Sequence, residues 1–97
     1  MPEYTLAVAL RSSAPLDDAA IDALRTVIRP GDAGLQLWRE PDRAVLRLTT
    51  ECAADDLHAA LEQGRDLADE ANDACPGRVF EVAAMDDEDS LVWRAGP

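Results

Sequence analysis

The stretch "ECAADDLHAALEQGRDLADEANDAC", residues 51–75, decides how this chain folds, because it indicates one long helix between two strand-like segments. At about 100° per residue, its apolar and small side chains fall within roughly 40° of one another on a helix. This stripe contains Leu57, Leu61, Gly64, Ala68, Ala71 and Cys75. Since a glycine inside a helix costs about 1 kcal/mol relative to alanine, we predict that Gly64 is there for close packing.

The opposite side of the same helix carries a row of carboxylates, which we name the acidic ridge. It consists of Asp55, Glu62, Asp66, Asp69 and Asp73. Like charges three or four residues apart on a helix destabilise it by a few tenths of a kcal/mol per pair. The ridge is therefore either a solvated face or a surface for a basic protein partner.

The two cysteines and the histidine of this stretch do not predict a metal or redox site. On the helix, Cys75 points into the core, His58 lies on a flank, and Cys52 lies at or before the helix start. About 35 Å of helix separates the two cysteines, whereas a disulfide needs Cα atoms closer than about 7 Å. A zinc site needs three or four converging ligands, so we expect no metal and no cofactor.

Alternating and helical patterns flank this helix on both sides. Apolar residues alternate over 4–11, 35–40, 44–50 and 78–85, which is typical of strands. Residues 16–28 follow the helical period, and Asp17 near their start is a good N-cap. A hairpin turn is predicted at 41–43, an acidic turn at 86–90, and a fifth strand or a docked tail within 91–97.

The order strand–helix–strand–strand–helix–strand predicts an α+β fold of the ferredoxin-like type. We expect a βαββαβ sandwich with a four-stranded antiparallel sheet in the order 4-1-3-2 and both helices on one face. The 97 residues correspond to a single domain, residues 1–97. A fold of this kind does not define a function.

Composition excludes several classes of function. Twenty acidic residues and nine arginines give a net charge of −11, which repels nucleic acid and anionic lipid. The central strands also offer no aromatic platform for stacking bases. No stretch approaches the roughly 20 apolar residues of a membrane span, and the N-terminus does not read as a signal peptide, so a cytoplasmic location is expected.

The sheet face away from the helices carries the candidate interface or ligand residues. If the helices cover Tyr4, Leu6 and the residues in phase with them, the open face presents Arg11, Trp38, Val45 and Arg47. Such a face is too apolar for a well-hydrated sheet, so either a partner covers it or Trp38 packs against Trp93 of the tail.

The sequence does not show which side of the segment 78–85 faces the core. One set of alternating residues is Phe80, Val82 and Ala84, and the other is Val79, Ala83 and Met85. Both sets are apolar, so the pattern does not choose between them.

Candidate catalytic groups do not converge. The pairs Asp17–Asp18 and Asp55–Asp56 lie where helix N-termini favour acids. The run 86–89 lacks the spacing of a calcium loop. We therefore expect a non-catalytic accessory, adaptor or regulatory protein that acts through protein–protein contacts as a homodimer. The alternative is a small ligand-binding protein or enzyme of the dimeric α+β barrel type, with its pocket on the open face.

Overall fold

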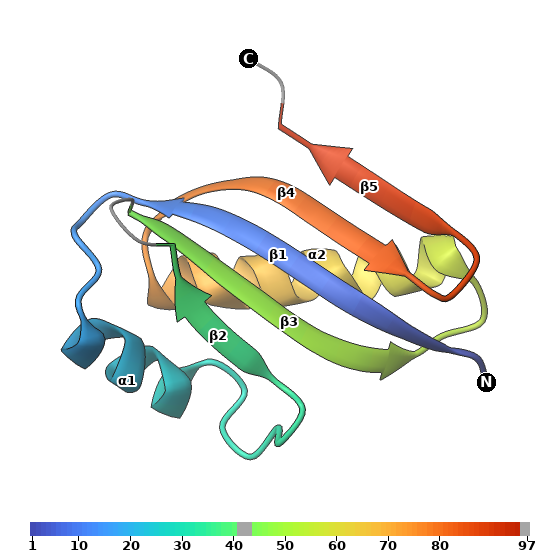
Figure 1. Cartoon of the computed structure of the whole chain (residues 1–97), viewed down its shortest axis with the longest axis horizontal. Coiled ribbons are helices and arrows are strands. Elements are labelled where there is room, and N and C mark those ends of the chain that lie inside the picture. The colour runs from blue at the N-terminus through green and yellow to red at the C-terminus, as the bar shows by residue number, and fades with distance from the viewer. Residues whose placement is uncertain (41–43, 96–97) are drawn as a thin grey trace.

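A computed structural model describes residues 1–40 and 44–95 of the chain and shows an α+β fold (Figure 1). The strands and helices follow one another as β1 (Glu3–Ser12), α1 (Asp18–Val27), β2 (Gln36–Arg39), β3 (Val45–Ala53), α2 (Leu57–Ala74), β4 (Gly77–Met85) and β5 (Ser90–Arg94). The predicted hairpin turn at 41–43 lies outside the described residues, as does the end of the predicted tail, 96–97. Among the described helices, none has both the length and the apolar composition needed to cross a membrane.

All five strands form one antiparallel sheet in the order β2-β3-β1-β4-β5. The predicted order of four strands, 4-1-3-2, differs from this observed order by the addition of β5, since β4, β1, β3 and β2 follow one another as predicted. The difference arises because residues 90–94 form a full strand that pairs with β4, from Glu81 opposite Arg94 to Met85 opposite Ser90. The sheet is consequently wider than expected and ends in two short edge strands, β2 and β5.

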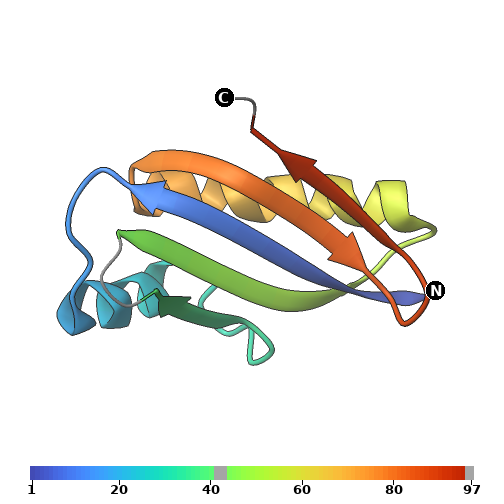
Figure 2. The same ribbon diagram turned by 45° about the horizontal axis from the view of Figure 1, so that its top comes forward.

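Both helices contribute to the same apolar core on one side of the sheet. In Figure 1 the viewer looks onto the uncovered side, with α2 behind β1 and β4, and Figure 2 shows the same layers from another angle. The main core cluster joins residues of α1, α2 and the strands, among them Ile21, Leu24, Leu37, Leu48, Leu67, Ala71 and Val82. The alternation of β1 is as predicted, since Tyr4, Leu6, Val8 and Leu10 are all buried in the core.

Helix α2 lies close to the sheet at Gly64, which confirms the reason predicted for this glycine. A Cβ atom added to Gly64 would come within 2.9 Å of Val82 Cγ1. Real Cβ atoms essentially never make so short a contact, so the helix could not lie at this distance with a larger residue. The stripe is nevertheless centred elsewhere than expected, because Leu67 and Ala60 are fully buried while Leu57 and Leu61 are only partly so.

The helix ends are held as the sequence indicates. The side chains of Asp17 and Asp56 accept hydrogen bonds of 2.8 Å from the backbone N–H groups of Ala20 and Ala59, respectively. Acidic residues at these positions are therefore explained by capping. After α1, Arg29 donates from both Nε and Nη2 to Glu70 Oε2, at 2.9 and 2.7 Å, and this joins the end of α1 to α2.

Candidate functional site

The uncovered face of the sheet carries a continuous row of four charged side chains, which we name the charge row. From the β2 edge to the β5 edge it consists of Glu40, Arg47, Glu81 and Arg94. Arg47 Nε donates to Glu40 Oε1, Arg47 Nη1 lies 4.0 Å from Glu81 Oε2, and Arg94 Nε donates to Glu81 Oε1 at 3.0 Å. The sign of the charge thus alternates along the row, from negative at β2 to positive at β5.

Ala9 on the central strand makes this row continuous. It is the Cα partner of Arg47 on one side and of Glu81 on the other, so the two charged side chains reach toward each other across β1. Any larger side chain at Ala9 would stand between them. In the present arrangement Ala9 is only 1% exposed, although no helix covers it. The charge row therefore shields the middle of the open face.

The open face is less apolar at its surface than the sequence predicts. Val45, an expected interface residue, is 1% exposed and belongs to neither core cluster. It lies opposite Arg11 on β1 and next to Arg47 in its own strand, so long charged side chains surround it on that face. Val45 is already covered within the monomer, and the expectation that it forms an exposed contact is wrong.

Among the described residues, two large apolar side chains remain exposed on this face, one at each edge of the sheet. Trp38 on β2 is 41% exposed and Val92 on β5 is 43% exposed. Trp38 is the Cα partner of Arg47, so it lies at the level of the charge row. Val92 pairs with Ala83 and lies two residues along β5 from Arg94, which belongs to the row. Trp38 thus keeps the accessible position that the sequence predicts.

A β-bulge in β4 explains why the sequence could not orient this strand. Ala9 pairs with Glu81, but the next residue, Leu10, pairs with Val79, so Phe80 has no partner on β1. An extra residue of this kind breaks the strict alternation of a strand. As a result, Val79 packs against the main core and Val82 is buried in it. The core side of β4 therefore takes residues from both of the alternating sets considered from the sequence.

The same bulge places Glu81 on the open face, and sequence reasoning missed this residue. Alternation alone does not show which face of the sheet Glu81 lies on. The two sets of alternating residues that could face the core in this strand are both apolar. Arg47 was the available signal, since a partly buried arginine on a sheet needs a carboxylate on a neighbouring strand. Glu81 and Glu40 show that carboxylates occur on this face beside the arginines that the sequence places there.

Arg11 lies at the far end of the open face, near the start of β4. Its guanidinium Cζ is 5.8 Å from the centre of the Phe80 ring, within the range of a cation–π contact. Arg11 is also the Cα partner of Arg78, so two positive side chains stand side by side there. Together with Ala95 these residues border a hollow of about 220 Å³.

Trp93 lies on the helix side of the sheet, away from Trp38. It pairs with Val82, packs against the main core, and has Arg65 Cζ of α2 5.7 Å from its ring centre. The alternative in which Trp38 packs against Trp93 is therefore wrong, and Trp93 is no part of the open face. The reason is again the register of β4 and β5, which the sequence pattern does not fix.

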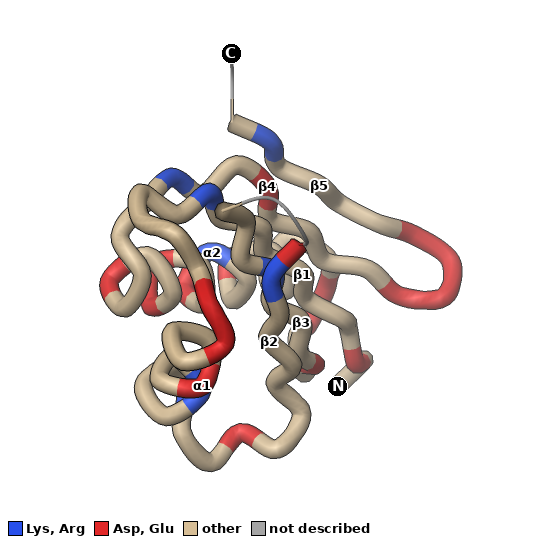
Figure 3. The backbone as a smooth tube through the Cα atoms, turned by 60° about the vertical axis from the view of Figure 1, so that its left-hand side comes forward, with Lys and Arg blue, Asp and Glu red and all other residues tan. Residues whose placement is uncertain are grey.

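The acidic ridge runs along α2, where Figure 3 marks the acidic residues in red on the backbone. All five of its members, Asp55, Glu62, Asp66, Asp69 and Asp73, are exposed. Three of them border a hollow of about 320 Å³ beside Trp93: Glu62, Asp66 and Asp69. The other side of the hollow is formed by Val79, Val82 and Trp93 of β4 and β5. Arg65 from the same helix already contacts the aromatic ring within it.

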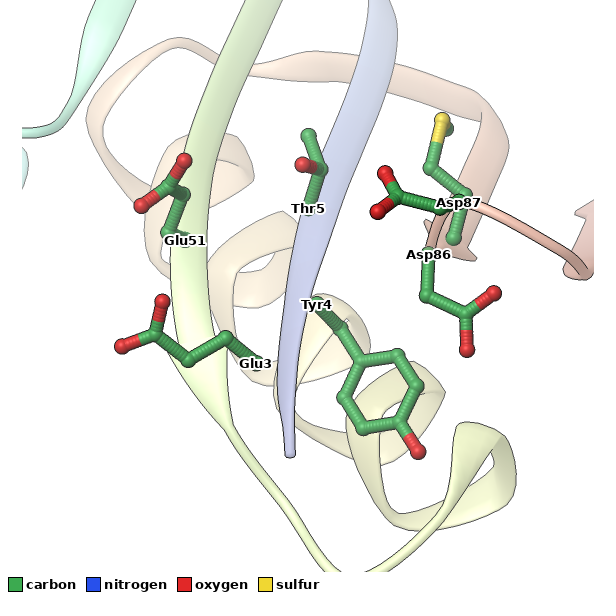
Figure 4. A pocket seen from close by; sticks show the side chains of 7 residues that line it. Glu3, Tyr4, Thr5, Glu51, Asp86 and Asp87 are labelled. Carbon is green, nitrogen blue, oxygen red and sulfur yellow. The ribbon is translucent and has the colours of Figure 1, made fainter. Parts of the chain in front are cut away.

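A second acidic region closes the opposite end of the open face (Figure 4). Residues of β1, β3, the end of β4 and the turn after it border a hollow of about 460 Å³: Glu3, Tyr4, Thr5, Glu51, Met85, Asp86 and Asp87. Burial, followed by the charge of Asp86, raises the pKa of Tyr4. The pKa of Asp86 is lowered, because its carboxylate accepts hydrogen bonds from the N–H groups of Asp89 and Glu88.

The cysteines and the histidine stay apart in the structure. Cys52 lies within β3, which continues to Ala53, so residues 51–53 are strand and not helix. Cys75 is the C-cap of α2, His58 is exposed, and both thiols are free. Burial raises the pKa of Cys52, which makes its thiolate scarcer at neutral pH. In the described part of the chain, no three His, Cys, Asp or Glu side chains are placed to hold a metal ion.

Comparisons with known proteins add no relative: no family model matches the chain, and neither curated proteins nor solved structures give a significant match.

Proposed function

We propose that this chain is a non-catalytic accessory, adaptor or regulatory protein that acts through protein–protein contacts as a homodimer. One observation carries the proposal: the helices cover one side of the sheet, while the other side keeps Trp38 and Val92 exposed at its two edges. Exposed aromatic and aliphatic side chains framed by charged groups are typical of protein interfaces. The covering of Val45 and Ala9 reduces the apolar area available, so the contact depends on the edges and on the charge row.

The ferredoxin-like assignment is part of this proposal. It is supported by the element order and by the presence of both helices in one core cluster on one side of an antiparallel sheet. In such an arrangement the uncovered face is the natural surface for self-association. β5 enlarges that face beyond the four strands of the expected fold.

The molar mass in solution tests the homodimer. We expect wild-type protein at micromolar concentration to have twice the 10.5 kDa of one chain by light scattering. Trp38→Glu places a charge in a dry contact, which costs several kcal/mol, and should give a monomer. Val27→Glu is the matched control, because Val27 is 62% exposed on α1, outside the open face, and should leave the dimer intact. A wild-type monomer would contradict the proposal.

A second candidate is a small ligand-binding protein or enzyme of the dimeric α+β barrel type. It is favoured by the polar groups that meet on the open face, since Arg47 forms ion pairs with both Glu40 and Glu81. Two such faces would enclose them between the copies. Native mass spectrometry separates the two candidates, because a ligand-binding dimer should retain a small molecule and an accessory dimer should have the mass of two bare chains.

A further inference from the structure

We infer, resting on the proposed homodimer, that the second copy packs on the open face about a two-fold axis running along β1 above Ala9. In this arrangement each charge of the charge row faces a charge of opposite sign. The order of signs in the row and the positions of Trp38 and Val92 both favour this arrangement. It defines both the partner, another copy of this chain, and the orientation in which that copy binds.

The alternation of signs makes the row complementary to its own reverse. From β2 to β5 the charges run negative, positive, negative, positive, through Glu40, Arg47, Glu81 and Arg94. A two-fold rotation about an axis parallel to the strands reverses this order in the second copy. Arg47 then faces the partner's Glu81 directly. Glu40 follows β2 two residues beyond Trp38, about 7 Å along the strands from the level of the partner's Arg94, a distance that the two long side chains can span. Because a two-fold interface repeats every contact, four favourable pairings result.

The other two-fold axis in the plane of the face gives the opposite result. An axis along the row, perpendicular to the strands, leaves the order unchanged, so Arg47 would face the partner's Arg47 and Glu81 the partner's Glu81. Like charges brought together at an interface weaken association strongly and suppress wrong arrangements. The charge row therefore selects one of the two face-to-face arrangements. Both arrangements keep the strands of the two sheets nearly aligned, a common way for sheets to pack, so the charges alone decide between them.

The exposed apolar side chains agree with the selected axis. Trp38 and Val92 lie on opposite edge strands, so the same rotation brings Trp38 of one copy over β5 of the other. Val92 lies two residues along β5 from the level of the row, about 7 Å at strand spacing, which a tryptophan side chain can span. Between the edges, beside the charge row, Ala7 is small and only partly buried, so side chains of the second copy can reach the sheet there.

The area of the face is sufficient for a stable dimer. A typical stable interface takes about 800 Å² from each partner. The chain exposes 5899 Å² in total, so the open face needs to supply about a seventh of this surface. A five-stranded sheet uncovered on one side can supply it, since the molecule extends 37 by 35 Å across its two longer axes.

Complementary charge reversals at the two ends of the row test the arrangement. In Glu40→Arg the row begins with a positive charge, and in Arg94→Glu it ends with a negative one. Each variant alone brings like charges together twice in its own dimer, so we expect its dissociation constant to rise about tenfold or more. An equimolar mixture of the two variants restores opposite charges at both ends. We expect this mixture to form a heterodimer with nearly wild-type affinity, measured by sedimentation velocity and native mass spectrometry.

Charge reversals on α1 provide the control. Asp22 and Arg25 pair with each other on the exposed side of that helix, at 2.9 Å. Asp22→Arg and Arg25→Glu should each leave the dimer at wild-type affinity. Circular dichroism of all four variants checks that the fold is retained.

Each outcome decides a different statement. If the wild-type chain is a monomer, the proposed homodimer fails and this inference fails with it. If the wild type is a dimer and neither reversal at the row weakens it, a different surface forms the dimer. If both reversals weaken the dimer but their mixture does not recover it, the open face is correct and the axis is wrong. Only weakening of each variant followed by recovery in the mixture supports the arrangement.

Discussion

The two faces of this sheet are built from alternate residues of the same strands, yet they are covered in different ways. On the helix side, Leu48 is completely buried and its neighbours pack against α1 and α2. On the open side, Ala9 is nearly as inaccessible, but ion-paired side chains on the neighbouring strands shield it. Burial of a residue in this protein therefore does not by itself indicate an apolar core.

The difference separates what stabilises the fold from what remains available for association. Apolar packing on the helix side depends on shape, and even one added methyl group there changes the stability of the fold. The charge row on the open side depends on the pairing of exposed or half-exposed groups, whose net contribution to stability is small. Substitutions on the helix side should thus affect unfolding, and substitutions on the open side should affect association.

The largest effect on stability is expected at Leu67, whose side chain is fully buried in the main core. Leu67→Ala leaves a cavity between α2 and the sheet and should lower the free energy of unfolding by about 2–5 kcal/mol. Urea denaturation at a fixed protein concentration measures the change. Asp69→Ala, on the exposed side of the same helix, should change it by less than about 0.5 kcal/mol. Equal losses in the two variants would contradict the packing described for α2.

A smaller effect is expected at Gly64, where helix propensity and packing have opposite signs. Alanine is favoured over glycine in a helix by about 1 kcal/mol. At Gly64 its Cβ would lie 2.9 Å from Val82 Cγ1, and overpacking of this kind costs about 1–3 kcal/mol. We therefore expect Gly64→Ala to destabilise the protein in thermal unfolding. Adding Val82→Ala removes the contacted atom, so the double variant should recover part of the loss due to alanine at position 64.

The smallest effect on stability is expected in the turn that connects β4 to the edge strand β5. The carboxylate of Asp86 accepts hydrogen bonds of 2.8 and 2.7 Å from the N–H groups of Glu88 and Asp89, which lowers its pKa below the ordinary 3.8. A lowered pKa in the folded state means that this stabilisation is present above the unfolded-state pKa. It is lost as the pH falls through the folded-state pKa.

NMR titration of the amide groups of Glu88 and Asp89 measures this turn directly. Their chemical shifts should change with a midpoint below pH 3.8, and in Asp86→Asn this transition should disappear. A midpoint at or above the ordinary carboxylate value would show that the turn does not hold Asp86 in its ionised form.

Much of the helix side could be predicted from the sequence, because each of its features has a local signal. Alternation identified the buried side of β1, Asp17 and Asp56 lay at helix starts, and Gly64 stood in the apolar stripe of α2. Each of these signals comes from residues close together in the sequence. Local patterns of this kind are sufficient to orient a strand or a helix against a core.

The open face could be predicted only in part, because its geometry depends on pairings between distant strands. The bulge at Phe80 inverts the alternation within β4, and no residue type in that segment signals it. The position of Glu81 in the charge row depends on where this bulge falls, and that of Trp93 on the helix side depends on the pairing of β5 with β4. The burial of Val45 likewise depends on Arg11, which is distant in the sequence but opposite in the sheet.

The most direct test of the central claim, that a second copy covers the open face, uses the two tryptophans as reporters. One copy is labelled with ¹⁵N, and the other carries a spin label at Ser90→Cys on β5, in a chain that also has Cys52→Ser. In the proposed dimer β5 lies over β2 of the partner, so the indole N–H signal of Trp38 should broaden. The Trp93 signal should stay sharp, because it lies four strand spacings away and on the helix side. Broadening of Trp93 without Trp38, or of neither signal at concentrations where the wild-type chain is a dimer, would contradict the account.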